Sequence, residues 1–265
     1  MKRLNTSKGI SGITSLLMGI TTLLFCYSVS AEEYNDWSGQ YAGMSLGVMA
    51  GKVNPSTTVT KGISYYSQDE DVTKLNSIFS SNFSDNDFSG TLIYGYQWQS
   101  ERLVYGIEAN LIINDYSSSK AVNEEPYASA SSLYFNSAIK IKNTFGLSIR
   151  PKVGYTFDNV LIDFSAGPTL SKFKYEFSLS DSTNQGTTGD YSDSKWALGV
   201  SAGLDFNYKM DNDYALYASY LYSYYPDIVD GSNHLKTSSS TFAEEFKHDA
   251  SFSSHTVSVG LVKYF

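Results

Sequence analysis

Residues 196–210 read WALGVSAGLDFNYKM, and they alternate without interruption between two kinds of side chain. From Trp196 onward every second residue is apolar or amphipathic, and the residues between them are small or polar. Because successive side chains of a strand point to opposite faces, this stretch predicts one β-strand with an apolar face and a polar face. It is longer than the usual strand of about 5–6 residues, but its length suits a tilted strand that crosses a bilayer.

The same pattern recurs in seven further segments, so we expect eight strands, at about 39–50, 88–98, 103–114, 143–157, 160–172, 196–210, 214–224 and 252–265. Short turns are expected at 99–102, 158–159 and 211–213, and long polar loops at about 51–86, 115–138, 178–193 and 226–250. An even strand number with alternating short turns and long loops is typical of outer-membrane barrels, whose short turns and termini are periplasmic. The sequence therefore predicts an all-β fold, an eight-stranded antiparallel up-and-down transmembrane β-barrel with external loops. The rival, a soluble barrel or sandwich, fits less well because the non-apolar face is crowded with Gly, Ser and Thr, which suits a narrow lumen.

The first 31 residues predict a secretory signal peptide. Three basic residues open the segment, an apolar stretch follows, and Val29-Ser30-Ala31 offers small residues for cleavage after Ala31. The alternative is an N-terminal membrane anchor. Export through the Sec pathway would leave residues 32–265 as the barrel domain in the cell outer membrane. The single cysteine, Cys26, lies in the segment that would be removed, so we expect no disulfide in the mature chain.

Composition and charge limit the kinds of molecule that the protein is expected to bind. Cleavage would remove three basic residues and no acidic one, so the net charge would fall from −8 to −11. That charge disfavours nucleic acid and anionic lipid as partners. Aromatic residues make up 15% of the chain, and Tyr and Trp favour membrane–water interfaces. We expect contact with outer-membrane lipid through the interface aromatics Trp37, Trp98, Trp196, Tyr208 and Phe265.

A set of charged side chains shares the inward parity of the predicted strands: Glu108, Arg150, Lys152, Asp163 and Asp205. A two-residue turn at Asp158-Asn159 places Gly154 opposite Asp163, so Lys152 lies diagonally across from Asp163. Opposite charges on neighbouring strands predict a structural network in the lumen. The functional alternative is an ion-conducting path, and in both cases an unpaired charge would be costly.

The chain offers little for catalysis or metal binding. There is no phosphate loop, cysteine cluster or dinucleotide fingerprint, so we expect no catalytic residue, no metal and no cofactor. Two weaker alternatives involve the histidines. His255 with the neighbouring serines could serve an outer-membrane lipid enzyme, and His234 with His248 could bind a metal or haem.

Four motifs in order resemble the Omp25/Omp31-like family of outer-membrane β-barrel proteins. They are WSGQYAG at 37–43, GYQWQ at 95–99 with YGIEA at 105–109, RPKVGYTFD at 150–158, and HTVSVGL at 255–261. The resemblance implies an eight-stranded surface protein of a kind described as porin-like, immunogenic or adhesive, some members being reported to bind haemin. It also implies that the terminal Phe265 is read by the barrel-assembly machinery. Lys263 departs from the family pattern, which has an aromatic residue at that position.

We therefore predict a non-enzymatic outer-membrane protein with an envelope structural or surface-interaction role, adhesin-like or antigen-like. The barrel would be the anchor, and the loops would face a host or envelope ligand. The alternatives are a small-solute porin and an outer-membrane lipid-modifying enzyme. We expect a monomer that does not bind nucleic acid.

Overall fold

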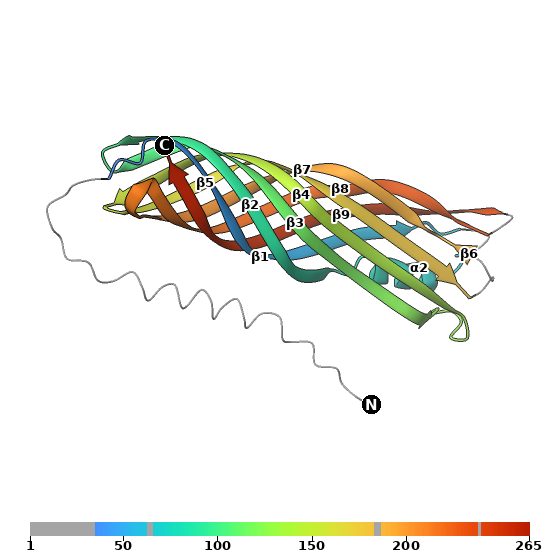
Figure 1. Cartoon of the computed structure of the whole chain (residues 1–265). Coiled ribbons are helices and arrows are strands. Elements are labelled where there is room, and N and C mark those ends of the chain that lie inside the picture. The colour runs from blue at the N-terminus through green and yellow to red at the C-terminus, as the bar shows by residue number, and fades with distance from the viewer. Residues whose placement is uncertain (1–34, 63–65, 183–186, 238–239) are drawn as a thin grey trace, which may run out of the picture. The chain divides into compact units, whose positions relative to one another are not determined.

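Eight long antiparallel strands, each hydrogen-bonded to two neighbours, close into a barrel in the computed structural model (Figure 1). The strands are β1 (Gly39–Val59), β2 (Phe83–Ser100), β3 (Leu103–Pro126), β4 (Tyr134–Phe157), β5 (Val160–Asp181), β7 (Tyr191–Lys209), β8 (Tyr214–Lys236) and β9 (Thr241–Tyr264). Neighbours in sequence pair, and β1 with β9 closes the ring. The predicted fold class is thus confirmed. The structure describes residues 35–62, 66–182, 187–237 and 240–265, so the predicted signal peptide lies outside the described residues.

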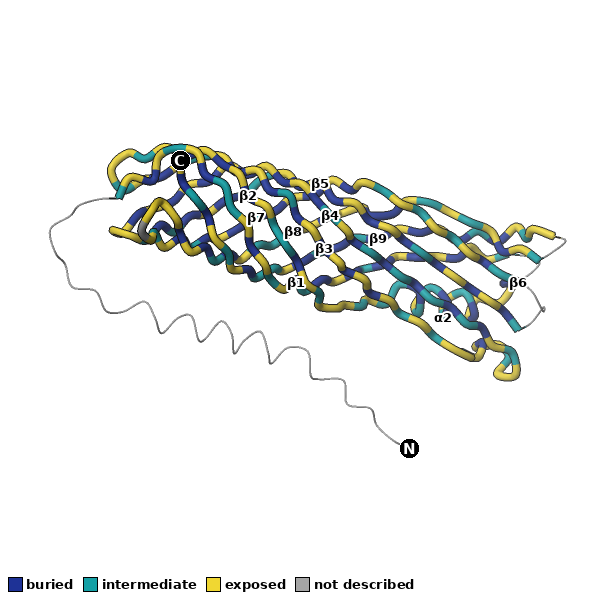
Figure 2. The backbone as a smooth tube through the Cα atoms, in the orientation of Figure 1, coloured by how far each residue is buried: buried dark blue, intermediate teal, exposed yellow. Residues whose placement is uncertain are grey.

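Along the half of the barrel that contains the start of β1 and the end of β9, the side chains face as the alternation predicts. Leu204 is 54% exposed on the outer surface, whereas Ser201 is 3% exposed and points into the lumen. The same alternation of exposed and buried residues follows every strand (Figure 2). Exposed apolar side chains thus form a continuous apolar band around the barrel, as contact with lipid requires. No helix among the described residues is long and apolar enough to cross a membrane.

The turns at this end are short, as predicted. Glu101, Asp158 and Asn212 adopt the left-handed conformation that tight turns need, with φ of 54°, 51° and 61°. The hairpin at Asp158-Asn159 has the predicted register, because Gly154 lies opposite Asp163. We call this the short-turn end and the opposite one the long-loop end.

At the long-loop end the predicted element boundaries are wrong. Much of the segments expected as loops, 51–86, 115–138, 178–193 and 226–250, is strand. The connections shrink to 60–82, 127–133, 182–190 and 237–240, and the third of them contains a two-residue strand, β6 (Thr187–Thr188). The strands continue because side chains beyond the apolar band pack inward and form a core of their own. We call this part of the barrel the extension. The position of the extension outside the cell remains a prediction.

A helix, α2 (Asp69–Phe79), lies in the first long connection and was not expected (Figure 1). Asp71, Leu75 and Phe79 are buried at a spacing of four residues, which places them on one face. The Phe79 ring contacts rings of β4, β5 and β9, with centroids 6.1, 5.3 and 6.2 Å away. The helix therefore packs into the mouth of the barrel.

Pairing between β7 and β8 stops part of the way along the barrel. The ladder ends at Val200 opposite Tyr224. Beyond that point β7 continues along β5 and β8 along β9, and Pro226 has no N–H to donate. Side chains cross the gap instead, since Lys195 Nζ lies 2.5 Å from Asp227 Oδ2. We call residues 191–199 and 225–235 the seam.

Candidate functional site in the closed lumen

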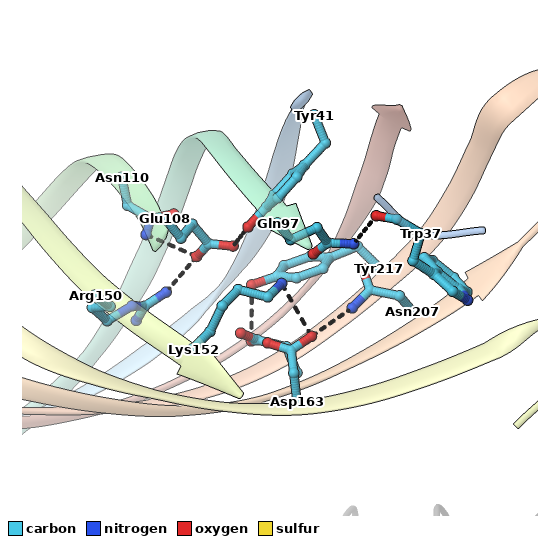
Figure 3. Close-up of polar contacts among 11 residues, drawn as sticks. Trp37, Tyr41, Gln97, Glu108, Asn110, Arg150, Lys152, Asp163, Asn207 and Tyr217 are labelled. Carbon is cyan, nitrogen blue, oxygen red and sulfur yellow. Dashed lines mark hydrogen bonds and ion pairs between the residues drawn. The ribbon is translucent and has the colours of Figure 1, made fainter. Parts of the chain in front are cut away.

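One polar cluster of the lumen centres on Glu108 of β3 (Figure 3). Arg150 of β4 lies directly opposite in the ladder, and its Nη2 is 2.8 Å from Glu108 Oε1. Asn110 donates a hydrogen bond of 2.9 Å to the same oxygen, and the Tyr41 hydroxyl donates one of 2.9 Å to Oε2. Three donors thus compensate one buried carboxylate, as a charge removed from water requires.

A second group contains the diagonal pair expected from the sequence. Lys152 Nζ lies 3.2 Å from Asp163 Oδ2. Asn207 donates a hydrogen bond of 3.2 Å to that oxygen, and the Tyr217 hydroxyl donates one of 2.9 Å to Asp205 Oδ1. All five charged residues named from the sequence therefore lie together in one part of the lumen.

The network is closed to solvent. Its charged residues are between 0 and 6% exposed. Arg150 Nε and Nη1 have no hydrogen-bond partner among the described residues, and Arg150 borders a small cavity of about 10 Å³ lined mainly by Ser, Thr and Asn side chains. A second cavity, of about 20 Å³, lies farther along the lumen and is bordered by Tyr225 and Phe252. Each of these cavities has room for about one water molecule rather than for a continuous water column.

An aromatic layer seals the short-turn end, and it includes one residue that the sequence misplaced. Trp37 was expected at the membrane interface but is fully buried inside the barrel. Gln97 Nε2 donates to the Trp37 carbonyl over 2.6 Å, and the Trp37 amide donates to Gln99 Oε1 over 2.8 Å. These bonds draw the segment before β1 across the lumen, where Trp37 packs edge-on against Tyr264 at 5.3 Å. The alternation of residues along the strands could not predict which way the Trp37 side chain points, because Trp37 precedes β1.

The other four aromatics named from the sequence lie on the outer surface. Trp98, Trp196, Tyr208 and Phe265 are 45, 44, 42 and 73% exposed. The Lys263 ammonium lies 5.4 Å from the Phe265 ring centre, so the unusual lysine of the last strand packs against the terminal aromatic. These positions suit contact with lipid and its headgroups.

The long-loop end is sealed by the core of the extension, which contains one of the three histidines. His248 of β9 is fully buried, and its Nε2 lies 2.7 Å from Asn233 Oδ1. Its Nδ1 lies 3.1 Å from the Thr57 hydroxyl and 3.2 Å from that of Tyr175. Burial lowers the pKa of His248 from 6.5 to about 4. Both ring nitrogens are thus engaged by protein groups.

A second histidine, His255, is exposed on the outer face, and His234 of β8 is exposed as well. His255 Nδ1 is 2.7 Å from the Tyr220 hydroxyl, on the neighbouring strand. Among the described residues, no group of three or more His, Cys, Asp or Glu side chains is arranged to hold a metal ion.

Several known proteins are similar to this chain. The 25 kDa outer-membrane immunogenic protein of Brucella ovis is 23% identical over 200 residues, which are 76% of this chain and 75% of that protein. Among solved structures, the outer membrane protease OmpT of Escherichia coli has a TM-score of 0.48 at 10% identity, covering 89% of this chain and 100% of OmpT. OprG of Pseudomonas aeruginosa has a TM-score of 0.43 at 11% identity, covering 89% and 100%. The family model described as the outer membrane protein beta-barrel domain matches residues 19–262. This chain therefore belongs to the outer-membrane protein β-barrel domain family and is a protein of the cell outer membrane.

Proposed function

We propose that this protein is a non-enzymatic surface-interaction protein, in which a closed barrel anchors a rigid binding platform. The observation that carries the proposal is that the lumen is filled at three levels. Aromatic side chains close the short-turn end, the charge network occupies the next level, and α2 with the core of the extension closes the other end.

The filled lumen favours this role over the porin alternative. A porin needs a continuous water path, whereas Glu108 and Arg150 are 1% and 2% exposed and bonded to each other. Displacing them for each passing solute would break a buried ion pair, which costs about 3–5 kcal/mol. The arrangement is suited to holding strands together.

The extension has the properties of a binding platform. Its apolar core fixes the strands that carry the exposed surface, and a rigid surface loses less conformational entropy on binding than a mobile loop does. Helix α2 presents Glu70, Thr73 and Ser77 on its exposed side. The seam adds strand edges that are not paired with each other, and such edges can accept an extended segment of another chain.

The experiment compares adhesion with conductance. Cells expressing the protein are tested on immobilised matrix glycoproteins, haem and envelope glycans. The test variant replaces Glu70, Thr73 and Ser77 with Ala, which favours helix formation and leaves the buried face intact. Ser100→Ala, in an exposed position at the short-turn end, is the matched control.

We expect binding to at least one probe that the triple variant loses and the control keeps, with both variants folded and heat-modifiable. In planar bilayers the wild type should show no steady conductance. Large steady conductance would instead favour the porin, and altered lipid A in mass spectra of expressing cells would favour the lipid enzyme.

A further inference from the structure

Four lysines gather on the outer wall of the extension, in a chain that is acidic as a whole. They come from two adjacent strands, Lys140 and Lys142 from β4 and Lys172 and Lys174 from β5. Lys142 lies directly opposite Lys174 in the ladder. The alternating burial of both strands places all four side chains on the outer face. We call them the lysine patch.

The lysine patch begins where the apolar band ends. Lys172 lies opposite Trp196 of β7, and the Trp196 ring packs edge-on against Phe145 of β4 at 5.0 Å. Trp at such a position marks the level of the lipid headgroups. On β3 the first outward-facing residue beyond the apolar band is Asp115, and on β7 it is Ser194.

Acidic neighbours compensate only part of this charge. Glu176 lies opposite Lys140 and forms an ion pair of 2.6 Å with Lys174. Asp115 lies in the β3 bulge, two residues before Ser117, which is directly opposite Lys142. Two positive charges remain in excess, and like charges directly opposite on paired strands destabilise the pairing unless something neutralises them.

We propose that the lysine patch binds the phosphate groups of the outer-leaflet glycolipid, lipopolysaccharide, with its acyl chains along the apolar band below. Basic clusters beside a membrane-spanning segment recognise anionic headgroups. The net charge of the chain argues against general attraction to anionic lipid, so the site is local and set by the β4–β5 register. Each lysine that contacts the headgroup layer strengthens binding about fivefold.

The test uses the refolded protein and native mass spectrometry. The probes are bis-phosphorylated lipid A, dephosphorylated lipid A and inorganic phosphate. The test variant is Lys142→Gln with Lys174→Gln, and the matched control is Lys52→Gln with Lys247→Gln, two exposed lysines of β1 and β9. All these side chains point outward, so heat-modifiable migration should be unchanged. Lys142→Arg with Lys174→Arg keeps the charge and should keep binding.

We expect the test variant to lose affinity for bis-phosphorylated lipid A by about 30-fold, while the control and the Arg variant match the wild type. Three results would overturn the proposal. They are an equal loss in the control, equal affinity of the wild type for dephosphorylated lipid A, and displacement of the lipid by millimolar inorganic phosphate. The last result would assign the lysine patch to free phosphate.

Discussion

Replacing Arg150 with Met should expose how far the barrel depends on its lumen network. The change keeps an apolar stem of similar length but removes the guanidinium group that faces Glu108 at 2.8 Å. The carboxylate would then keep only its bonds from Tyr41 and Asn110. Since the site is cut off from water, we expect the free energy of unfolding to fall by about 3–5 kcal/mol.

The second change, Glu108→Gln, should restore much of this loss in the double variant. Gln is neutral; its one carbonyl oxygen can take the place of Oε1 and accept from Asn110, and its amide nitrogen, in the place of Oε2, can donate to the Tyr41 hydroxyl oxygen. The double variant should therefore be only about 1–2 kcal/mol less stable than the wild type, because no buried charge stays unpaired. We expect the coupling energy of Arg150 with Glu108 to exceed that of the longer pair, Lys152 with Asp163, measured with Lys152→Ala and Asp163→Ala.

The assay is urea unfolding of the barrel in lipid vesicles, followed by tryptophan fluorescence and by heat-modifiable migration. Ser201→Ala is the control, because Ser201 Oγ is buried in the lumen and no described residue forms a hydrogen bond with it, so its loss should cost little. Coupling energies near zero for both pairs would refute a structural network. A rise in steady conductance without loss of stability in Arg150→Met would point to an ion path.

Further predictions concern the two halves of the barrel. Leu204→Arg should cost about 2–4 kcal/mol in the same titration if Leu204 lies near the bilayer midplane, and a cost as small as that of Ser201→Ala would mean that the facing is wrong. Phe79→Ala removes a buried ring and should cost about 3–5 kcal/mol, seen as faster proteolysis of the extension; unchanged protection would contradict the packing of α2. The pKa of His248 is about 4 when folded against 6.5 ordinarily, so the unfolded chain takes up the proton first. Stability should hence fall by about 2 kcal/mol between pH 6.5 and pH 5, a loss that His248→Gln should abolish and that denaturant titrations at both pH values would reveal. Protease added to intact cells should cut within the long connections and spare the turn at 158–159; cleavage there would invert the topology.

The sequence predicted the lipid-facing half of the barrel because one rule governs every strand there. Lipid contacts one face of each strand and the narrow lumen contacts the other. The alternation of residues along the strand therefore predicts whether each side chain points outward or inward. The two-residue turn after β4 also allowed residues to be counted across the hairpin, which located Lys152 beside Asp163. The partner of Arg150 could not be found in this way, because β3 and β4 are joined by a longer connection and the ladder contains bulges.

Helix α2 could not be placed from the sequence for a different reason. Its fully buried apolar positions, Leu75 and Phe79, are few, and most other residues of the helix are polar, so the segment reads as part of a polar loop. What holds the helix is contact with rings on three strands that are far apart in the chain. Local propensity carries no information about such contacts.

The extension was missed for one physical reason. At the membrane surface, the apolar side chains of the strands change from the outer face of the barrel to the inner face. On β5, Leu170 faces outward, whereas Phe173 and Phe177 face inward; on β1, Val48 faces outward and Val53 inward. In hydrocarbon the outer face must be apolar, but in water the same strand gains free energy by turning apolar side chains to the interior. If the apolar side chains of a strand are assumed to stay on one face, the predicted strand ends where they change face. The residues beyond that point are then assigned to a loop. The change of face is therefore the sequence signal of a barrel that continues beyond its membrane, and the lysine patch on β4 and β5 lies where that signal occurs.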